Sequence, residues 1–249
     1  MKKKGLSSSA QVSVFVIVGI VIVAGLFIFL FISKDYKNDI NTNNIKNFVS
    51  DCIKQTGFDV LYKVGKGGGY YFPANFSTGS GVTYYYSNGK GYVPAKSDIE
   101  KEISFYLERK LFLCTNNFKD FPDFNISQED IKVNTKIKDN YVDLDVLYPL
   151  SISKGENTEL LKNFKVEIPV RFGVLYDSAK SIIDEQLGHE SICLTCLLNI
   201  SVKNNFYADI IVYDNQTVIF SFRDEKSKID DKAFIFAFAN KYKISEERI

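Results

Sequence analysis

The first hydrophobic feature of the chain is a run of 21 positions without a charged residue, from 12 to 32. A helix over this run reaches about 31 Å at 1.5 Å per residue, which is enough to cross the hydrocarbon core of a bilayer. The end of the run, Phe27 to Ile32, lacks the small-residue cleavage site of a secretory signal. The pattern therefore predicts a single transmembrane helix over 12–32 that is retained as an anchor.

The charges on either side of this run predict its orientation. Lysines at positions 2–4 precede it, whereas Lys34 and Lys37 after it are offset by Asp35 and Asp39. Positively charged flanks stay in the cytoplasm. The basic leader, residues 1 to 11, is therefore predicted to be cytoplasmic, and the chain after the helix is predicted to lie outside the cell membrane.

Beyond the helix, the polar and Asn-rich segment 33–44 is a predicted linker, and 45–249 is a predicted α+β domain. Apolar residues at helical spacing predict one helix from Ile45 to about Gly65, and a capping-box sequence from Ser97 to Glu100 predicts the start of a second. The two apolar stripes are Ile45, Phe48, Val49, Cys52 and Ile53, then Ile99, Ile103, Leu107, Leu111 and Cys114. A third helix is predicted over 175–187.

Alternating polar and apolar positions predict antiparallel strands in the second half of the domain. Segments 131–137 and 142–146 alternate around the turn Asp139-Asn140, so a hairpin with Lys136 opposite Asp143 is expected. Asn88-Gly89 marks another hairpin. Further strands are predicted at 164–170, 206–213, 217–222 and 233–239. The expected fold is antiparallel sheets packed with two to four helices, as one unit or as lobes over 45–130 and 131–249.

The charge balance excludes one class of partner. After the three leading lysines the chain has 28 basic and 30 acidic residues. A nearly neutral domain lacks the basic surface that nucleic acids require. We therefore expect no nucleic-acid partner.

Four cysteines, an even number, lie in the part of the chain predicted to be extracytoplasmic, where disulfides persist. Cys52 and Cys114 lie on the apolar stripes of two helices, and a bridge between them is the simplest interpretation. Cys193 and Cys196 have C-x-x-C spacing, which is compatible with a local structural disulfide or with a redox pair. His189 with Cys193 and Cys196 could supply three ligands of a zinc site, but no fourth ligand is evident and no metal site is predicted.

Tyrosines are concentrated between the first two predicted helices. Six of them, with Phe72 and Phe76, fall within 23 residues, a density typical of protein interfaces and of sugar-stacking surfaces. The six are Tyr70, Tyr71, Tyr84, Tyr85, Tyr86 and Tyr92. This region is the predicted partner-binding surface, although packing within the hairpin also explains such a pattern.

No residue pattern predicts catalysis or a cofactor. The glycine run 65–69 closes a helix instead of opening one, so it is not a phosphate-binding loop. Asp143 and Asp145 share a strand face, but Lys136 is expected to pair with Asp143 across the hairpin. The single histidine has no G-x-S-x-G partner motif. No catalytic residue and no cofactor are predicted.

Two resemblances accompany these patterns. The basic segment that ends in Lys4-Gly5, followed by Gln11-Val-Ser13, resembles the class III signals of archaeal type IV pilin-like proteins. The resemblance implies a short cleaved leader and a helix that packs into a filament. Phe15 stands where that family has a glutamate that pairs with a neighbouring subunit.

The domain resembles uncharacterised single-span surface proteins of small-genome symbiotic archaea. The resemblance covers roughly 48–242 and implies topology and cysteine placement only. It rests on Phe48-Val-Ser-Asp-Cys52, Gly67-Gly-Gly-Tyr70, Pro94 to Glu102, Tyr148-Pro149, Ile168-Pro-Val-Arg171 and Phe238 to Tyr242.

The leading hypothesis is a membrane-anchored surface protein of the cell envelope that is not an enzyme. In this hypothesis the tyrosine-rich region binds another envelope protein or a surface glycan. One alternative is a minor pilin-like subunit of a filament or secretion apparatus. A second alternative is an envelope thiol-disulfide protein that uses Cys193 and Cys196.

Overall fold

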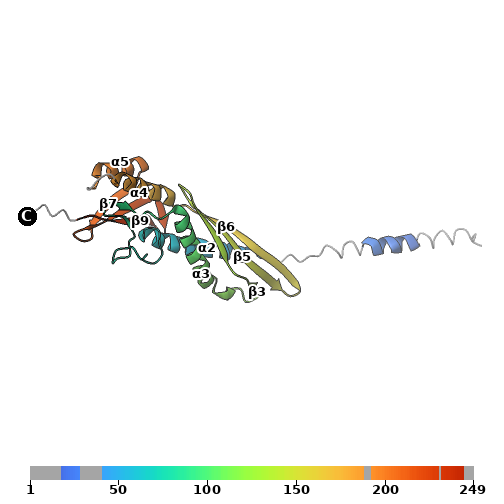
Figure 1. Cartoon of the computed structure of the whole chain (residues 1–249). Helices are drawn as coiled ribbons and strands as arrows, with labels where there is room; N and C mark the ends of the chain where they lie inside the picture. Colours follow the sequence, from blue (N-terminus) through green and yellow to red (C-terminus); the bar gives the residue numbers. More distant parts are fainter. Residues whose placement is uncertain (1–17, 29–40, 188–191, 230, 244–249) are drawn as a thin grey trace, which may run out of the picture. The chain divides into compact units, whose positions relative to one another are not determined.

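The structure, a computed structural model, describes residues 18–28, 41–187, 192–229 and 231–243 (Figure 1). The chain divides into two units, 1–41 and 42–249, and each is described by itself. Of the predicted transmembrane segment 12–32, residues 18–28 are described and are helical. Among the described residues, no helix combines the length and the apolar character needed to cross a membrane.

The second unit is an α+β domain, as predicted. The helices described in it are α2 (Asn43–Lys66), α3 (Lys96–Thr115), α4 (Phe172–Gln186) and α5 (Leu194–Asn204), with a short 3-10 turn, η1 (Asn116–Phe118), after α3. Helix α2 begins inside the predicted linker and ends one residue beyond Gly65. Helix α5 was not predicted, because Leu197 and Ser201 are its only buried residues.

One sheet has the strand order β2-β1-β9-β8-β7. Its strands are β1 (Tyr84–Ser87), β2 (Lys90–Gly91), β7 (Tyr207–Val212), β8 (Thr217–Ile229) and β9 (Lys232–Lys241). The Asn88-Gly89 hairpin forms as predicted, with both residues at positive φ. The pairing of β1 with β9 is parallel, whereas the other pairs in this sheet are antiparallel.

The second sheet is built around a long central strand. It contains β3 (Asn125–Gln128), β4 (Lys132–Ile137), β5 (Val142–Lys154) and β6 (Asn157–Ile168). Strand β5 pairs with β6 along one side, and on the other side with β4 and then β3. The predicted register of the β4–β5 hairpin is confirmed, since Lys136 lies opposite Asp143.

Helix α2 packs against both sheets and joins them into one core. A Cβ on Gly57 would lie 2.5 Å from the Ile168 side chain of β6, and one on Gly65 would lie 2.6 Å from a backbone oxygen of β9. Glycine therefore permits both close approaches. Two lobes divided between 130 and 131 do not form: residues from both sides of that boundary share the first sheet, and 42–249 is one compact unit.

Helix α3 covers the free edge of β4 with side chains spaced one turn apart. Glu100, Ser104 and Glu108 accept hydrogen bonds from the backbone N–H groups of Ile137, Thr135 and Val133, at 2.9, 3.1 and 2.8 Å. Because side chains at i, i+4 and i+8 share one helix face, they match alternate residues of the strand. The edge is thereby closed to another strand.

Two predictions of local pairing are corrected by this arrangement. The capping box does not form: α3 has Ala95 as its N-cap without a side-chain cap, and Glu100 bonds to β4 instead. The ammonium of Lys136 pairs with Glu100 at 3.1 Å, so the expected ion pair with Asp143 is not the one observed. The helix presents a carboxylate closer to the lysine than the strand does.

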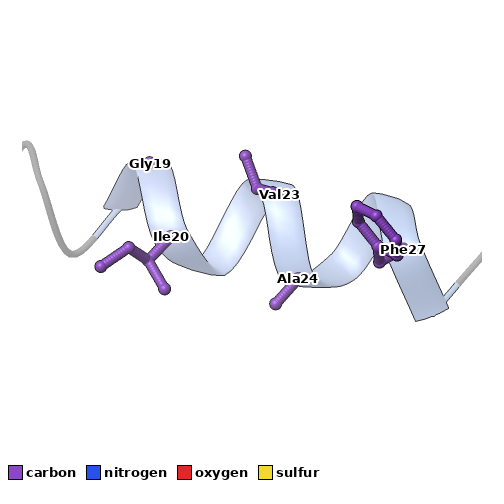
Figure 2. A pocket seen from close by; sticks show the side chains of 5 residues that line it. All are labelled: Gly19, Ile20, Val23, Ala24 and Phe27. Atoms are coloured by element: carbon purple, nitrogen blue, oxygen red, sulfur yellow. The ribbon is translucent and has the colours of Figure 1, made fainter.

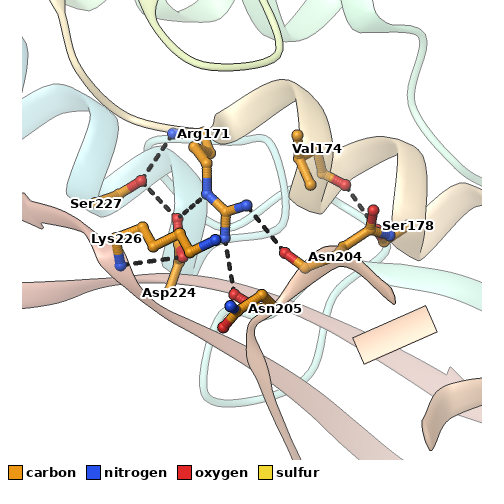
Figure 3. A network of polar contacts seen from close by, with 8 residues as sticks. All are labelled: Arg171, Val174, Ser178, Asn204, Asn205, Asp224, Lys226 and Ser227. Atoms are coloured by element: carbon orange, nitrogen blue, oxygen red, sulfur yellow. Dashed lines mark hydrogen bonds and ion pairs between the residues drawn. The ribbon is translucent and has the colours of Figure 1, made fainter. Parts of the chain in front are cut away.

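A buried ion pair connects α4, α5 and β8 (Figure 3). Arg171, just before α4, donates to the fully buried carboxylate of Asp224 and, at 2.9 and 3.0 Å, to the carbonyls of Asn204 and Asn205 at the end of α5. The Ser227 hydroxyl donates to Asp224 at 2.6 Å. Every acceptor here is satisfied from within the protein, so the network holds the fold together and leaves no group for a ligand.

Candidate binding site

The segment that joins α2 to β1 is held closely against the first sheet. The Thr83 hydroxyl donates a hydrogen bond of 2.7 Å to the carbonyl of Gly67. Gly68 has a φ of +67°, and a Cβ there would lie 2.9 Å from the carbonyl oxygen of Ala237 on β9. Only glycine meets both conditions without strain. The glycine run thus ends α2, as predicted. It also holds the beginning of the following aromatic segment close to the sheet.

Aromatic residues of this segment, of the β1–β2 hairpin and of α3 surround a surface hollow of about 570 Å³. This volume lies within the range of small-molecule binding sites in proteins. The aromatic lining consists of Tyr70, Phe72, Phe76, Tyr84, Tyr92 and Tyr106. We call this feature the aromatic hollow.

The rings form two groups of contacts. Phe76 contacts Tyr84 and Tyr92, with centroid separations of 5.0 and 4.9 Å. Phe72 meets Tyr106 edge to face at 5.5 Å. Phe72 remains 60% exposed, Tyr92 46% and Phe76 41%. Aromatic side chains that contact neighbouring rings and are also exposed to solvent can stack with a ligand.

The hollow also contains polar groups. Glu102 accepts a hydrogen bond of 3.0 Å from the backbone N–H of Tyr71, which fixes one of its carboxylate oxygens. Within the part of the chain that the structure describes, its other oxygen makes no hydrogen bond and can accept one from a ligand. Burial, and then the charges of Asp98 and Glu102, raise the pKa of the Tyr70 phenol. Tyr70 is therefore a neutral hydroxyl that donates to or accepts from a ligand at any physiological pH.

The six predicted tyrosines divide into two groups. Tyr70, Tyr84 and Tyr92 line the aromatic hollow. Tyr71, Tyr85 and Tyr86 are 8%, 0% and 4% exposed and belong to the core, where Tyr85 stacks on Phe238 at 5.1 Å. The core group cannot contact a partner, so that part of the predicted binding surface is corrected. Exposure does not alternate along β1, because this strand is covered on both faces.

The sequence patterns did not indicate that α3 contributes two residues to the hollow. Glu102 and Tyr106 lie one turn apart on α3 and face the hollow from outside the tyrosine-rich segment. The sequence could have indicated them, because residues at i and i+4 share a helix face and neither residue belongs to the apolar stripe of α3. Only the packing of α3 beside the 67–83 segment brings them to the site.

The predicted cysteine pairs are both disulfide-bonded. Cys52 of α2 and Cys114 of α3 have Cα atoms 5.7 Å apart, and those of Cys193 and Cys196 are 5.3 Å apart. Glu185 places a carboxylate oxygen within 4.8 Å of both sulfurs of the second pair. Disulfide sulfurs are not thiolates, so this group has no metal-binding form while the bridge is intact. His189 lies outside the described residues.

The helix over 18–28 carries a separate hollow of about 440 Å³ (Figure 2). It is lined by Gly19, Ile20, Val23, Ala24 and Phe27, which are all apolar. No polar group is present there to orient a ligand, so it is not a candidate site. The signal-like residues Lys4, Gly5, Gln11 and Ser13 lie outside the described residues.

Comparisons of the chain with family models, with curated proteins and with solved structures found no match. The aromatic hollow and the two disulfides are therefore the features of the described residues that bear on function.

Proposed function

We propose that the protein is a membrane-anchored surface protein of the cell envelope whose extracytoplasmic domain binds a surface glycan in the aromatic hollow. The observation that supports the proposal is the set of exposed rings of Phe72, Phe76 and Tyr92, held in place around a hollow of about 570 Å³. In this function the domain binds without chemical conversion of the ligand. The anchor is the uncharged run 12–32.

The chemistry of the hollow favours a sugar over a protein partner. The C–H face of a pyranose ring packs on an aromatic ring, and its hydroxyls need fixed acceptors and donors at the edge. Tyr70 and Glu102 supply these groups beside the rings. A protein partner requires about 800 Å² of contact on each side. One or two sugar units bound in a concave site require a smaller contact area.

The direct test is binding of purified envelope polysaccharide to the full-length protein in detergent micelles. Calorimetric titration with the polysaccharide should give saturable binding. Replacing Phe72, Phe76 or Tyr92 by alanine should weaken it about two- to tenfold each, because one stacked ring contributes about 0.5 to 1.5 kcal/mol.

The matched control is Phe112→Ala. Phe112 is a 47% exposed phenylalanine of α3 that lies outside the aromatic hollow, so its removal should leave the affinity unchanged. Equal affinity of all four variants would contradict the proposal. Binding of an envelope protein but of no polysaccharide would replace the glycan with a protein partner.

The anchor is tested separately by the intact mass and N-terminal residue of the protein from its native membranes. A chain that begins at Met1 or Lys2 supports a plain signal anchor. A chain that begins at Gly5, Leu6 or Gln11 would show processing of the prepilin type and favour a filament subunit.

A further inference from the structure

The Cys193–Cys196 disulfide lies at the N-terminal end of helix α5. Cys193 is the N-cap residue, and its sulfur accepts a hydrogen bond of 3.2 Å from the backbone N–H of Cys196. The Thr195 hydroxyl lies 3.5 Å from the same sulfur. In the reduced protein these groups and the helix dipole stabilise a thiolate at Cys193. The C-x-x-C motif therefore begins a helix, which is a position that stabilises a cysteine thiolate.

This disulfide contributes little to the stability of the fold. The two cysteines are three positions apart and belong to one helical turn, so the bridge restricts the unfolded chain only slightly. Helix α5 is attached to the domain elsewhere, by the bonds from Arg171 to the carbonyls of Asn204 and Asn205 (Figure 3). Loss of the bridge therefore leaves α5 in place.

The surroundings of the bridge allow a thiol to reach it. Both cysteines are partly exposed, and the residue between Cys193 and Thr195, Leu194, is 55% exposed. Glu185, from the last turn of α4, places a carboxylate within 4.8 Å of both sulfurs. A negative charge at that distance disfavours a thiolate and so opposes the effect of the helix end. Because these two effects oppose each other, neither the thiolate nor the thiol form of the reduced pair is strongly favoured.

We propose that Cys193–Cys196 is a redox-active disulfide that oxidises the dithiol of a polypeptide substrate. A substrate thiolate attacks the sulfur of Cys193, a mixed disulfide forms, and Cys196 leaves and takes up a proton. The second substrate thiol loses its proton and attacks the substrate sulfur that is bonded to Cys193. The substrate disulfide forms, and Cys193 is released as a thiolate. Two electrons pass from the substrate dithiol to the cysteine pair. One of the two substrate protons is retained on Cys196 and the other enters the solvent.

The test uses the full-length protein in detergent micelles and does not depend on the aromatic hollow. The protein is equilibrated in glutathione buffers of graded redox potential, free thiols are alkylated, and each cysteine is assigned by peptide mass. Cys193 and Cys196 should be reduced while Cys52 and Cys114 stay oxidised, and the initial rate of reduction should be at least about tenfold higher. If both bridges are reduced together, the proposal is wrong.

A trapping experiment tests the direction of attack. Cys196→Ser leaves Cys193 free and should form a stable mixed disulfide with a peptide that carries an activated disulfide, whereas Cys193→Ser should react at least about tenfold more slowly. A second measurement uses Glu185→Gln, which should lower the pH midpoint of Cys193 alkylation in the reduced protein. Equal reactivity of the two cysteine variants, or a midpoint that rises, would overturn the assignment.

Discussion

The two disulfides of this protein are opposites in almost every respect. Cys52–Cys114 joins two helices, lies against the core and is separated by 62 positions in sequence. Cys193–Cys196 lies within the first turn of one helix, is partly exposed and spans three positions. A bridge stabilises by restricting the unfolded chain, and the restriction grows with the loop that it closes. The first bridge therefore contributes more to stability than the second, which is consistent with the redox role proposed for the second.

The largest effect is expected from removing the helix-joining bridge. The Cys52→Ser, Cys114→Ser double variant should lose about 4 kcal/mol of unfolding free energy, because the bridge closes a loop of some 62 residues. Denaturant unfolding followed by circular dichroism measures the loss. A loss of less than about 1 kcal/mol would show that the packing of α2 on α3 suffices without the bridge.

A somewhat smaller loss of unfolding free energy is expected when the Arg171 side chain that holds α5 is replaced. Arg171→Met leaves the carboxylate of Asp224, which is 0% exposed, without its counter-charge and should cost about 3 kcal/mol. Arg171→Lys is the matched control, because it keeps the charge but not the fork that reaches both Asn204 and Asn205. If limited proteolysis does not cut α5 faster in Arg171→Met, the Arg171 network is not what holds that helix.

The attachment of α3 provides a third comparison. Ser104→Ala removes the hydrogen-bond acceptor of the Thr135 backbone N–H. Because Thr135 is only 2% exposed, this N–H is left unpaired, and the unfolding free energy should fall by about 2 kcal/mol in the same assay. Ser97→Ala is the control, because the capping box to which Ser97 was assigned does not form. A cost of about 1 kcal/mol for Ser97→Ala would instead indicate a working cap.

The smallest effect on stability is expected at the exposed bridge. The Cys193→Ser, Cys196→Ser double variant should lose no more than about 1.5 kcal/mol, because a three-residue loop restricts the unfolded chain little. The difference in unfolding free energy between the two double variants measures how far the two bridges differ in their contribution to stability. A loss as large as that at Cys52–Cys114 would make the second bridge structural and remove the reason to assign it a redox role.

Much of the domain follows from short-range patterns. The alternation on either side of Asp139-Asn140 predicted the register of β4 and β5, which is confirmed. The strand predicted at 233–239 also forms: it is β9, which lies between β8 and β1, and its Phe234, Phe236 and Phe238 are 0% exposed. In both cases the free energy of burying apolar side chains selects one face of a strand, and the sequence carries that information directly.

The candidate site was predicted only in part. The tyrosine-rich segment was located, but its buried and exposed tyrosines could not be separated by alternation. Glu102 and Tyr106 of α3 complete the hollow only because that helix packs beside the segment. The exposed bridge was found by its spacing, whereas its place at a helix end was missed, because α5 buries too few residues to show a helical stripe.

By itself, the sequence determined the α+β class, the central hairpin and the pairing of Cys52 with Cys114, because each depends on local periodicity or on the burial of a few residues. Only the tertiary structure decided which tyrosines face solvent, that Glu100 bonds to a strand instead of capping its helix, and that β1 runs parallel to β9. These outcomes depend on contacts between residues far apart in the chain. Competition among such contacts for the same side chains is settled only when the core has packed.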